Sequence, residues 1–207
     1  MIKIKKIDVF YALQKIGLKK NDSVFITSSL GSLGFPVSKS KNHLLTLSKW
    51  LLQSLQTILG EKGNIFVPTY TYSFTKNKKI FSLRNSKSTI GYFPNYFLRQ
   101  QNVHRSMDPM ISVAGLGPMA RQTTKNISKT SYGKNSIFEK LLYIKDLKCL
   151  NFGVDINWIP FIHYLDWENK VPFRSIKKLQ GTIILGKKKK KIQWDYYARD
   201  LRKETIS

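Results

Sequence analysis

The sequence predicts an α/β fold that ends in an antiparallel ribbon, and three observations support this. Short apolar runs typical of buried strands occur at 24–27, 64–67 and 147–154. Between the first two runs, residues 44–59 carry apolar side chains at helical spacing. Near the C-terminus, residues 181–185 and 191–197 alternate in polarity on either side of a lysine run, which predicts two paired strands.

Length and composition favour one globular domain, residues 1–207, with a C-terminal ribbon over 175–207. A chain of 207 residues buries about 70% of its unfolded surface on folding, which is enough for a core without disulfides. The single cysteine, Cys149, lies in an apolar run and is expected to be a core thiol in a reducing compartment. No signal-peptide or membrane-spanning run is present, so we expect a cytoplasmic protein without a membrane partner.

The formal net charge of +24 has two interpretations. Lysines are spread over the whole chain, which is typical of a biased composition that fills solvated positions. Alternatively, the charge serves an anionic partner such as a nucleic acid, an anionic membrane surface or a phosphorylated small molecule. A basic nucleic-acid-binding protein is therefore an alternative function, although no helix-turn-helix, zinc or RNA-binding motif supports it.

In chain order, the first predicted element is a short helix over residues 8–17. Asp8 is placed to cap it, and Val9, Leu13 and Ile16 share one face. The strand that follows, 24–27, is expected to be buried.

Two loops rich in hydroxyl groups follow the first two strands, at 28–34 and 68–74. In α/β folds, ligands bind at the carboxyl ends of strands, so these loops are candidate binding segments. The first is neither a Walker loop nor a G-x-G-x-x-G loop. It remains open at this point whether it is an ordinary glycine loop. The polar stretch that continues to Ser88 is expected to lie on the surface.

The middle of the chain predicts a helix over 91–101, a strand over 111–115 and a short helix over 136–142. Residues 115–120 match a loose dinucleotide pattern, G-x-G-x-x-A. Pro118 and the lack of an apolar helical stripe afterwards argue against a nucleotide site, and favour close backbone packing.

The segment that carries the candidate chemistry follows the apolar run 147–154, which we expect to be a central strand. It contains His163 with Asp166 three residues later, a spacing that puts both on one helix face. A carboxylate can hold an imidazole in one tautomer for general-base catalysis. Glu168, at i+5, is the alternative orienting acid. The simpler interpretation is a surface helix with acids nearby by chance. The three histidines and one cysteine show no metal-ligand spacing, so no metal is predicted.

Six segments in order resemble the aminoglycoside 3-N-acetyltransferase family over roughly residues 8–175. They are V-F-I-T-S-S-L-G-S-L-G, G-N-I-F-V-P-T-Y-T, H-R-S-M-D-P-M-I-S-V-A-G-L-G, Y-G-K-N-S-I-F-E-K-L, N-F-G-V and F-I-H-Y-L-D. The resemblance implies a three-layer α/β/α sandwich with a mixed, largely parallel central sheet. It also implies acetyl-coenzyme A as the acyl donor and a small-molecule amine as the acceptor.

By this resemblance, His163 and Asp166 correspond to the family's catalytic histidine and its usual glutamate. The segment Ser28–Gly34 corresponds to the one that borders the pantetheine arm. The resemblance thus implies donor-binding residues Ser28, Ser29, Leu30, Ser32, Leu33, Gly34, Thr69, Arg105, Ser106 and Ser112. We expect Tyr72, Asp108 and Glu168 to contact the acceptor.

The sequence departs from the family at two positions. Thr27 replaces the first histidine of the common H-S-S-L, and Asp108 replaces the histidine of R-S-x-H-P. Asp108 suits contact with a cationic amine or a sugar, or it only shapes the turn before Pro109. Family members also run some tens of residues longer. These departures motivate a second alternative, a family member that keeps the fold without the activity.

The segments around N-K-V-P-F-R and D-Y-Y-A-R-D-L-R look more like relatives associated with bacterial surface-polysaccharide amino sugars than drug-modifying members. The predicted function is therefore transfer of an acetyl group to a primary amine of an amino sugar or aminoglycoside. His163 is predicted to take the amine proton while Asp166 steadies the other ring nitrogen. Donors for the developing oxyanion are expected from residues 28–32.

Overall fold

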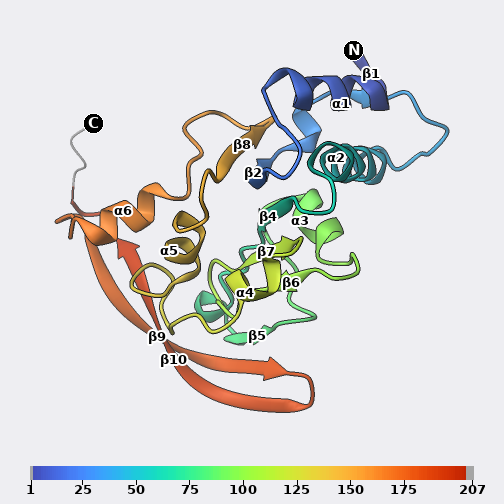
Figure 1. Cartoon of the computed structure of the whole chain (residues 1–207). Helices are drawn as coiled ribbons and strands as arrows, with labels where there is room; N and C mark the ends of the chain where they lie inside the picture. Colours follow the sequence, from blue (N-terminus) through green and yellow to red (C-terminus); the bar gives the residue numbers. More distant parts are fainter. Residues whose placement is uncertain (1, 204–207) are drawn as a thin grey trace.

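The computed structural model describes residues 2–203, which form a five-stranded sheet covered by helices on both faces, with a long ribbon beside it (Figure 1). The elements are β1 (Lys3–Ile4), α1 (Lys6–Lys15), β2 (Ser23–Ser28), η1 (Leu30–Ser32), β3 (Phe35–Pro36), α2 (His43–Leu59), β4 (Asn64–Pro68), η2 (Ser73–Thr75), β5 (Ile80–Ser82), α3 (Tyr92–Phe97), β6 (His104–Arg105), β7 (Val113–Leu116), α4 (Ala120–Thr124), α5 (Ile137–Leu142), β8 (Lys148–Phe152), α6 (Ile162–Glu168), β9 (Arg174–Leu185) and β10 (Lys188–Arg199).

The main sheet has the strand order β6-β7-β4-β2-β8. Strand β2 pairs in parallel with β4 and with β8, whereas β4–β7 and β7–β6 are antiparallel. The predicted mixed sheet is confirmed, with parallel and antiparallel pairings in equal number. The parallel half brings the carboxyl ends of β2, β4 and β8 to one edge, which is the edge where ligands bind in such sheets.

Alternation along β2 explains why helices cover both faces of the sheet. Val24 and Ile26 point into a core shared with α1, α2 and α3, while Phe25 points into a second core shared with α5, α6 and the ribbon. Because successive strand side chains face opposite ways, one apolar strand serves both cores. The first face is closed mainly by the 17-residue helix α2, which Asn42 caps and Gly60 ends.

The ribbon of β9 and β10 is longer than its alternating pattern predicts, with twelve residues in each strand. It joins β5 in a separate sheet of order β10-β9-β5, and it curves past α5 and α6 (Figure 1). Trp194 is fully buried and donates its indole N–H to Ser131 Oγ at 2.9 Å. The ribbon therefore supplies part of the second core rather than a free hairpin.

Several predictions from the sequence need correction. Strand β8 is an edge strand, not a central one, and the single cysteine on it is exposed rather than buried. Asp8 is not the N-cap of α1 but its third helical residue, where its carboxylate accepts from Lys5 N at 2.7 Å. The polar stretch before Ser88 is not all surface, because β5 lies within it and buries Phe81.

Two further corrections concern helices α1 and α3. Ile16, expected on the apolar face of the first helix, is 57% exposed just beyond its end. Helix α3 ends at Phe97, several residues before the predicted end. The chain at Gly117 does pack closely, as predicted: its φ of 119° suits glycine, and a Cβ there would collide with the Gly63 carbonyl oxygen.

Candidate active site

Helix α6 brings His163 and Asp166 together, as the i,i+3 spacing predicts. The His163 Nδ1 atom lies 3.5 Å from Asp166 Oδ2. The helix is only seven residues long. Phe161 and Tyr164 anchor it, because both side chains are buried in the second core. Tyr132 packs its ring edge-on against the imidazole, with 5.5 Å between ring centroids. The ring is therefore fixed in position by packing as well as by polar contacts.

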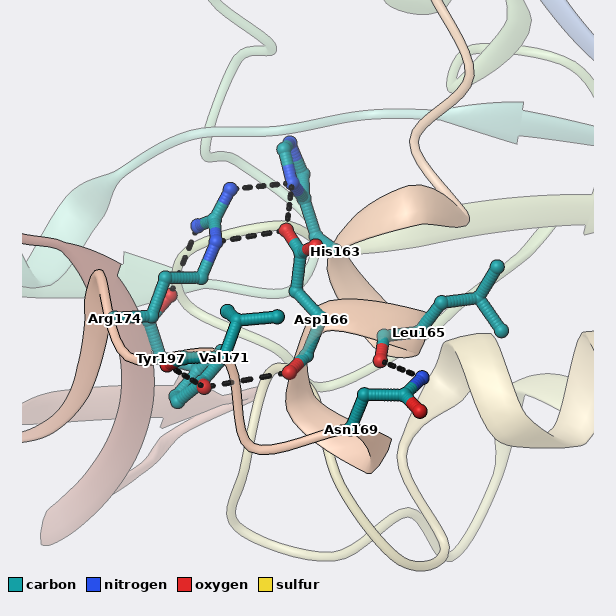
Figure 2. A network of polar contacts seen from close by, with 7 residues as sticks. All are labelled: His163, Leu165, Asp166, Asn169, Val171, Arg174 and Tyr197. Atoms are coloured by element: carbon teal, nitrogen blue, oxygen red, sulfur yellow. Dashed lines mark hydrogen bonds and ion pairs between the residues drawn. The ribbon is translucent and has the colours of Figure 1, made fainter. Parts of the chain in front are cut away.

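A third residue, Arg174 at the start of β9, completes this polar group (Figure 2). Its Nε donates to Asp166 Oδ2 at 2.8 Å, and its Nη2 lies 2.7 Å from His163 Nδ1. A guanidinium only donates, so in this arrangement Nδ1 accepts and a neutral imidazole carries its proton on Nε2. Arg174 is thus a closer partner of Nδ1 than Asp166 is.

The pKa of His163 is lowered from its ordinary value, first by burial and second by the positive charge of Arg174, while Asp166 acts in the opposite direction. Desolvation disfavours the charged imidazolium, and a nearby cation does the same. The side chain is 38% exposed, so it is reachable by solvent. At neutral pH His163 is an uncharged imidazole, the form that can accept a proton.

His163 lines a cavity of about 250 Å³, which we call the small cavity. Its walls are strongly aromatic, and the charged residue among them is Arg174. The lining consists of Tyr70, Tyr72, Tyr132, Asn157, Trp158, Ile159, Pro160, Ile162, His163, Arg174 and Tyr196.

A second cavity of about 500 Å³, the large cavity, lies at the carboxyl end of β2. The loop that was predicted as a binding segment contributes Ser28, Ser29, Leu30 and Gly31 to its wall, and Thr27 lines it as well. Tyr70, Trp158 and Pro160 line both cavities, so the two are neighbours that share one wall. The histidine and the serine-glycine loop therefore face adjoining spaces.

Two hydroxyl groups on the wall of the large cavity have no hydrogen-bond partner among the described residues. They are Ser28 Oγ and Tyr70 Oη, and both atoms are buried. Burial raises the pKa of Tyr70 well above its ordinary value, so its hydroxyl remains protonated and able to donate. Unpaired buried hydroxyls are costly, and they suit a ligand with amide or carbonyl groups.

Several residues that the resemblance assigned to donor binding do not line either cavity. The Ser32 hydroxyl is within hydrogen-bond distance of the carbonyl oxygens of Ser29 and Gly153, each at 2.7 Å. This contact holds the loop against the end of β8. Leu33 and Gly34 follow in the same turn and are also outside the lining.

Thr69, Arg105, Ser106 and Ser112 form a buried network instead. Arg105 donates from Nε to Ser112 Oγ at 3.0 Å and from Nη2 to the Thr69 carbonyl at 2.7 Å. Ser106 Oγ accepts from Val113 N at 2.9 Å. All four residues are at most 8% exposed. Their polar groups bond to other groups of the protein, and none of the four residues lines either cavity.

Asp108 is fully buried and shapes a turn. Its Oδ1 accepts from Met110 N at 2.7 Å, from Ile111 N at 2.9 Å and from Ser131 Oγ at 3.1 Å. Burial raises its pKa to about 6, although these hydrogen bonds and Arg105 oppose the shift. Of the two interpretations of Asp108, the structure supports the turn. Glu168 is exposed and lies outside the lining, whereas Tyr72 lines the small cavity.

The sequence model of the aminoglycoside 3-N-acetyltransferase family matches residues 25–206. The chain belongs to this family. Its members transfer an acetyl group from acetyl-coenzyme A to an amine, which confirms the predicted enzyme class and acyl donor. A search of curated proteins found no match.

Several solved structures share the fold. The YokD protein from Bacillus subtilis has a TM-score of 0.77 at 20% identity, covering 93% of this chain and 81% of its own. AAC-IIIb, solved with CoASH, and AAC-VIa, solved with sisomicin, each have a TM-score of 0.80 at 15% and 16% identity, covering 95% of this chain and 77% of theirs. At such identity these likenesses confirm the α/β fold and do not by themselves transfer residue roles.

Within residues 2–203 no helix is both long and apolar enough to cross a bilayer. Nor do the described residues contain a group of three histidine, cysteine or acidic side chains that could hold a metal ion.

Sequence reasoning missed most of the small-cavity wall, including Tyr70, Tyr132, Arg174 and Tyr196. Arg174 was within reach, because it closes the segment N-K-V-P-F-R that follows the histidine. The tyrosines come from three distant segments, and nothing in their local sequence sets them apart from core aromatics.

Proposed function

We propose that this acetyltransferase acetylates a primary amine of an amino sugar, with His163 as the general base. The observation that supports this most directly is the shared wall of the two cavities. A donor in the large cavity and an acceptor in the small cavity would meet at Tyr70 and Trp158, beside the imidazole. Holding both reactants in adjoining sites makes the reaction effectively unimolecular.

The large cavity fits the pantetheine part of acetyl-coenzyme A. Its volume of about 500 Å³ is within the range of small-molecule sites. The unpaired hydroxyls of Ser28 and Tyr70 match the amide and thioester carbonyls of that arm. We assign Tyr70 Oη, at the junction of the cavities, to the negative charge that develops on the thioester carbonyl oxygen.

His163 acts on the acceptor amine. When the amine attacks the thioester carbonyl, a C–N bond forms, the C–S bond breaks and the amine nitrogen loses one proton. His163 Nε2 accepts that proton and returns it to the departing thiolate. Nε2 has no hydrogen-bond partner among the described residues, which leaves it available.

This role requires the imidazole to hold its resting proton on Nδ1. Asp166 Oδ2, 3.5 Å away, is the acceptor for that proton, and it would also stabilise the imidazolium that forms. The present contact from Arg174 Nη2 competes for Nδ1. A small rotation of the guanidinium that keeps the hydrogen bond from Nε to Asp166 would move Nη2 away from Nδ1. Nδ1 could then carry the proton and donate it to Asp166.

The test is His163→Ala, measured by thiol release from acetyl-coenzyme A with a panel of amino sugars and aminoglycosides. We expect turnover to fall by at least about 100-fold, with coenzyme A binding unchanged because the histidine lies in the other cavity. Thr27→Ala is the matched control in the large cavity, and it should affect donor affinity rather than proton transfer. Unchanged turnover in the His163 variant would remove the base assignment.

A further inference from the structure

The small cavity differs from what a polycationic acceptor needs. Among the described residues that line it, none is acidic, and Arg174 is the one that is charged at neutral pH. An aminoglycoside carries several ammonium groups, which are best held by carboxylates. A cavity with a guanidinium in its wall repels such a ligand instead.

Two carboxylates interact with residues of this cavity but lie outside its lining, Asp166 and Asp108. Asp166 is paired with Arg174 at 2.8 Å and is 14% exposed. Asp108 is fully buried: two backbone N–H groups and Ser131 occupy its Oδ1, while its Oδ2 has no hydrogen-bond partner among the described residues. Neither residue belongs to the cavity lining, so the wall itself presents no carboxylate to a ligand.

Arg174 retains donors for an anion. Its Nε is taken by Asp166, one N–H of Nη2 meets the imidazole, and Nη1 makes only a long contact of 3.5 Å to the Tyr197 carbonyl. A guanidinium has five N–H groups in a planar fork that matches phosphate and carboxylate oxygens. Part of that fork is therefore free on a residue that lines the cavity.

The shape of the small cavity points to a single sugar ring. Its volume of about 250 Å³ is below the roughly 300–1,000 Å³ of sites for drug-sized ligands. Its walls combine flat aromatic faces with the hydroxyls of Tyr72 and Tyr196, whose pKa values burial raises, to about 12 for Tyr196. These remain neutral hydrogen-bonding groups, which suits a sugar and not several ammonium groups.

We propose that the acceptor is an amino sugar that carries a phosphate group, and that Arg174 binds this phosphate. The inference rests on the proposed acetyltransferase function. It adds a coupling between binding and catalysis: a phosphate that engages Nη2 draws it away from His163 Nδ1. The imidazole then takes its proton on Nδ1, donates to Asp166, and presents a free lone pair at Nε2. Only an anionic acceptor prepares the base in this way.

The first measurement is binding, by isothermal titration calorimetry with the full chain. The ligands are glucosamine 1-phosphate, uridine diphosphate glucosamine, methyl glucosaminide and sisomicin. We expect both phosphorylated ligands to bind about 10–100-fold more tightly than methyl glucosaminide, the range expected for a hydrogen bond to a charged group. A preference for the nucleotide-linked sugar over glucosamine 1-phosphate would identify the source of the phosphate.

Three variants separate the Arg174 contact from general attraction to a basic protein. Arg174→Met should abolish the preference for phosphate, and Arg174→Lys should retain a reduced preference while keeping a cation beside Asp166. Lys178→Met removes an exposed charge from the same strand and should leave the preference intact. Thermal unfolding of each variant shows that it is folded. Tighter binding of sisomicin, or a phosphate preference that survives Arg174→Met, would overturn the proposal.

The second measurement is the tautomer of His163, read from the ¹⁵N shifts of its ring nitrogens. The chain has three histidines, so His163→Gln assigns the signal. We expect the proton to move from Nε2 to Nδ1 when glucosamine 1-phosphate binds, and to stay on Nε2 with methyl glucosaminide. No change with the phosphorylated sugar contradicts the coupling.

The proposed function and this inference fail in different ways. Thiol release with sisomicin but not with phosphorylated amino sugars would keep the acetyltransferase and exclude the anionic acceptor. Arg174-dependent binding of the phosphorylated sugars without thiol release would keep the binding site and exclude the reaction.

Discussion

Two arginines with little exposed side-chain area lie in different hydrogen-bond networks of this protein and do different things. Arg105 and the Arg174 side chain are 8% and 10% exposed. Arg105 donates to the carbonyl oxygens of Thr69 and Ser86, to a serine hydroxyl, and packs over the Phe81 ring. Arg174 instead contacts an imidazole and a carboxylate at a cavity wall.

The difference shows that burial alone does not reveal the role of an arginine; its partners do. The partners of Arg105 are neutral groups on separate segments, so the guanidinium is a cross-link between loops. Burial lowers its pKa to about 10, with Asp108 opposing the shift, so it stays charged. The partners of Arg174 can themselves change protonation state or tautomer, so moving this guanidinium has chemical consequences.

The largest expected effect is on stability, from Arg105→Met. The substitution removes the Arg105 donor from the Ser86 carbonyl and the Ser112 hydroxyl, and one of two donors from the Thr69 carbonyl, which keeps Ser112 Oγ. A lost hydrogen bond in a buried site costs about 1–3 kcal/mol. We expect the free energy of unfolding to fall by about 3–5 kcal/mol in urea titrations. Arg174→Met is the matched variant, with a loss of about 1–2 kcal/mol. Equal losses would mean that both arginines are structural.

The second prediction concerns the carboxylates beside the two arginines. Asp108 has its pKa raised from 3.8 to about 6, so the native state binds its proton more tightly than the unfolded state. Stability from this group is therefore present below the unfolded pKa and is lost as the pH rises through the folded one. Because one unit corresponds to about 1.4 kcal/mol, ionised Asp108 costs about 3 kcal/mol at neutral pH.

Asp108→Asn keeps an oxygen for Met110 and Ile111 and removes the charge. The difference in unfolding free energy between this variant and the native chain should grow in favour of the variant from pH 4 to pH 7. Asp108→Ala controls for the turn, because it loses the hydrogen bonds as well and should be less stable throughout. A difference that is flat with pH would contradict the raised pKa.

These two sites also show how far the sequence leads. Period and composition predicted the helix over 44–59 and the strands over 24–27 and 64–67, because burial imposes a visible spacing on them. The edge position of β8 was not visible, because strand order is set by pairing between distant segments. Strand β5 was hidden in a polar stretch for the same reason.

For the candidate site, sequence reasoning found the i,i+3 pair of His163 and Asp166, because both lie on one short helix. It assigned Arg105, which lies within a family segment, to the donor site and gave Arg174 no role. Which way each side chain points depends on tertiary packing, and only the structure places the first in a saturated network and the second at a cavity.

A third prediction sharpens the contrast at Arg174 itself. The pKa of His163 is lowered by burial and by Arg174, and raised by Asp166. In Arg174→Met the carboxylate remains without its cation, so the pKa of His163 should rise. An NMR titration of the ring between pH 4 and pH 9 measures this directly. Arg105→Met, which touches no group near the imidazole, should leave the pKa of His163 unchanged. An unchanged pKa of His163 in the Arg174 variant would show that burial alone accounts for the lowered value.

The smallest expected effect separates the two acids that the sequence offered as partners of the histidine. Glu168 is exposed on α6, and Asp166 is the one that touches both Arg174 and the imidazole. Glu168→Gln should change unfolding free energy by no more than about 0.5 kcal/mol, as is usual for surface substitutions, and should leave thiol release within experimental error. Asp166→Asn changes the same charge two residues away and should lower thiol release clearly, because Nδ1 loses the acceptor that fixes its tautomer. The pair of variants is matched in charge and in helix, so any difference between them reports on contact with Arg174 and His163. Equal turnover in both would mean that the imidazole is oriented by packing against Tyr132 and not by a carboxylate.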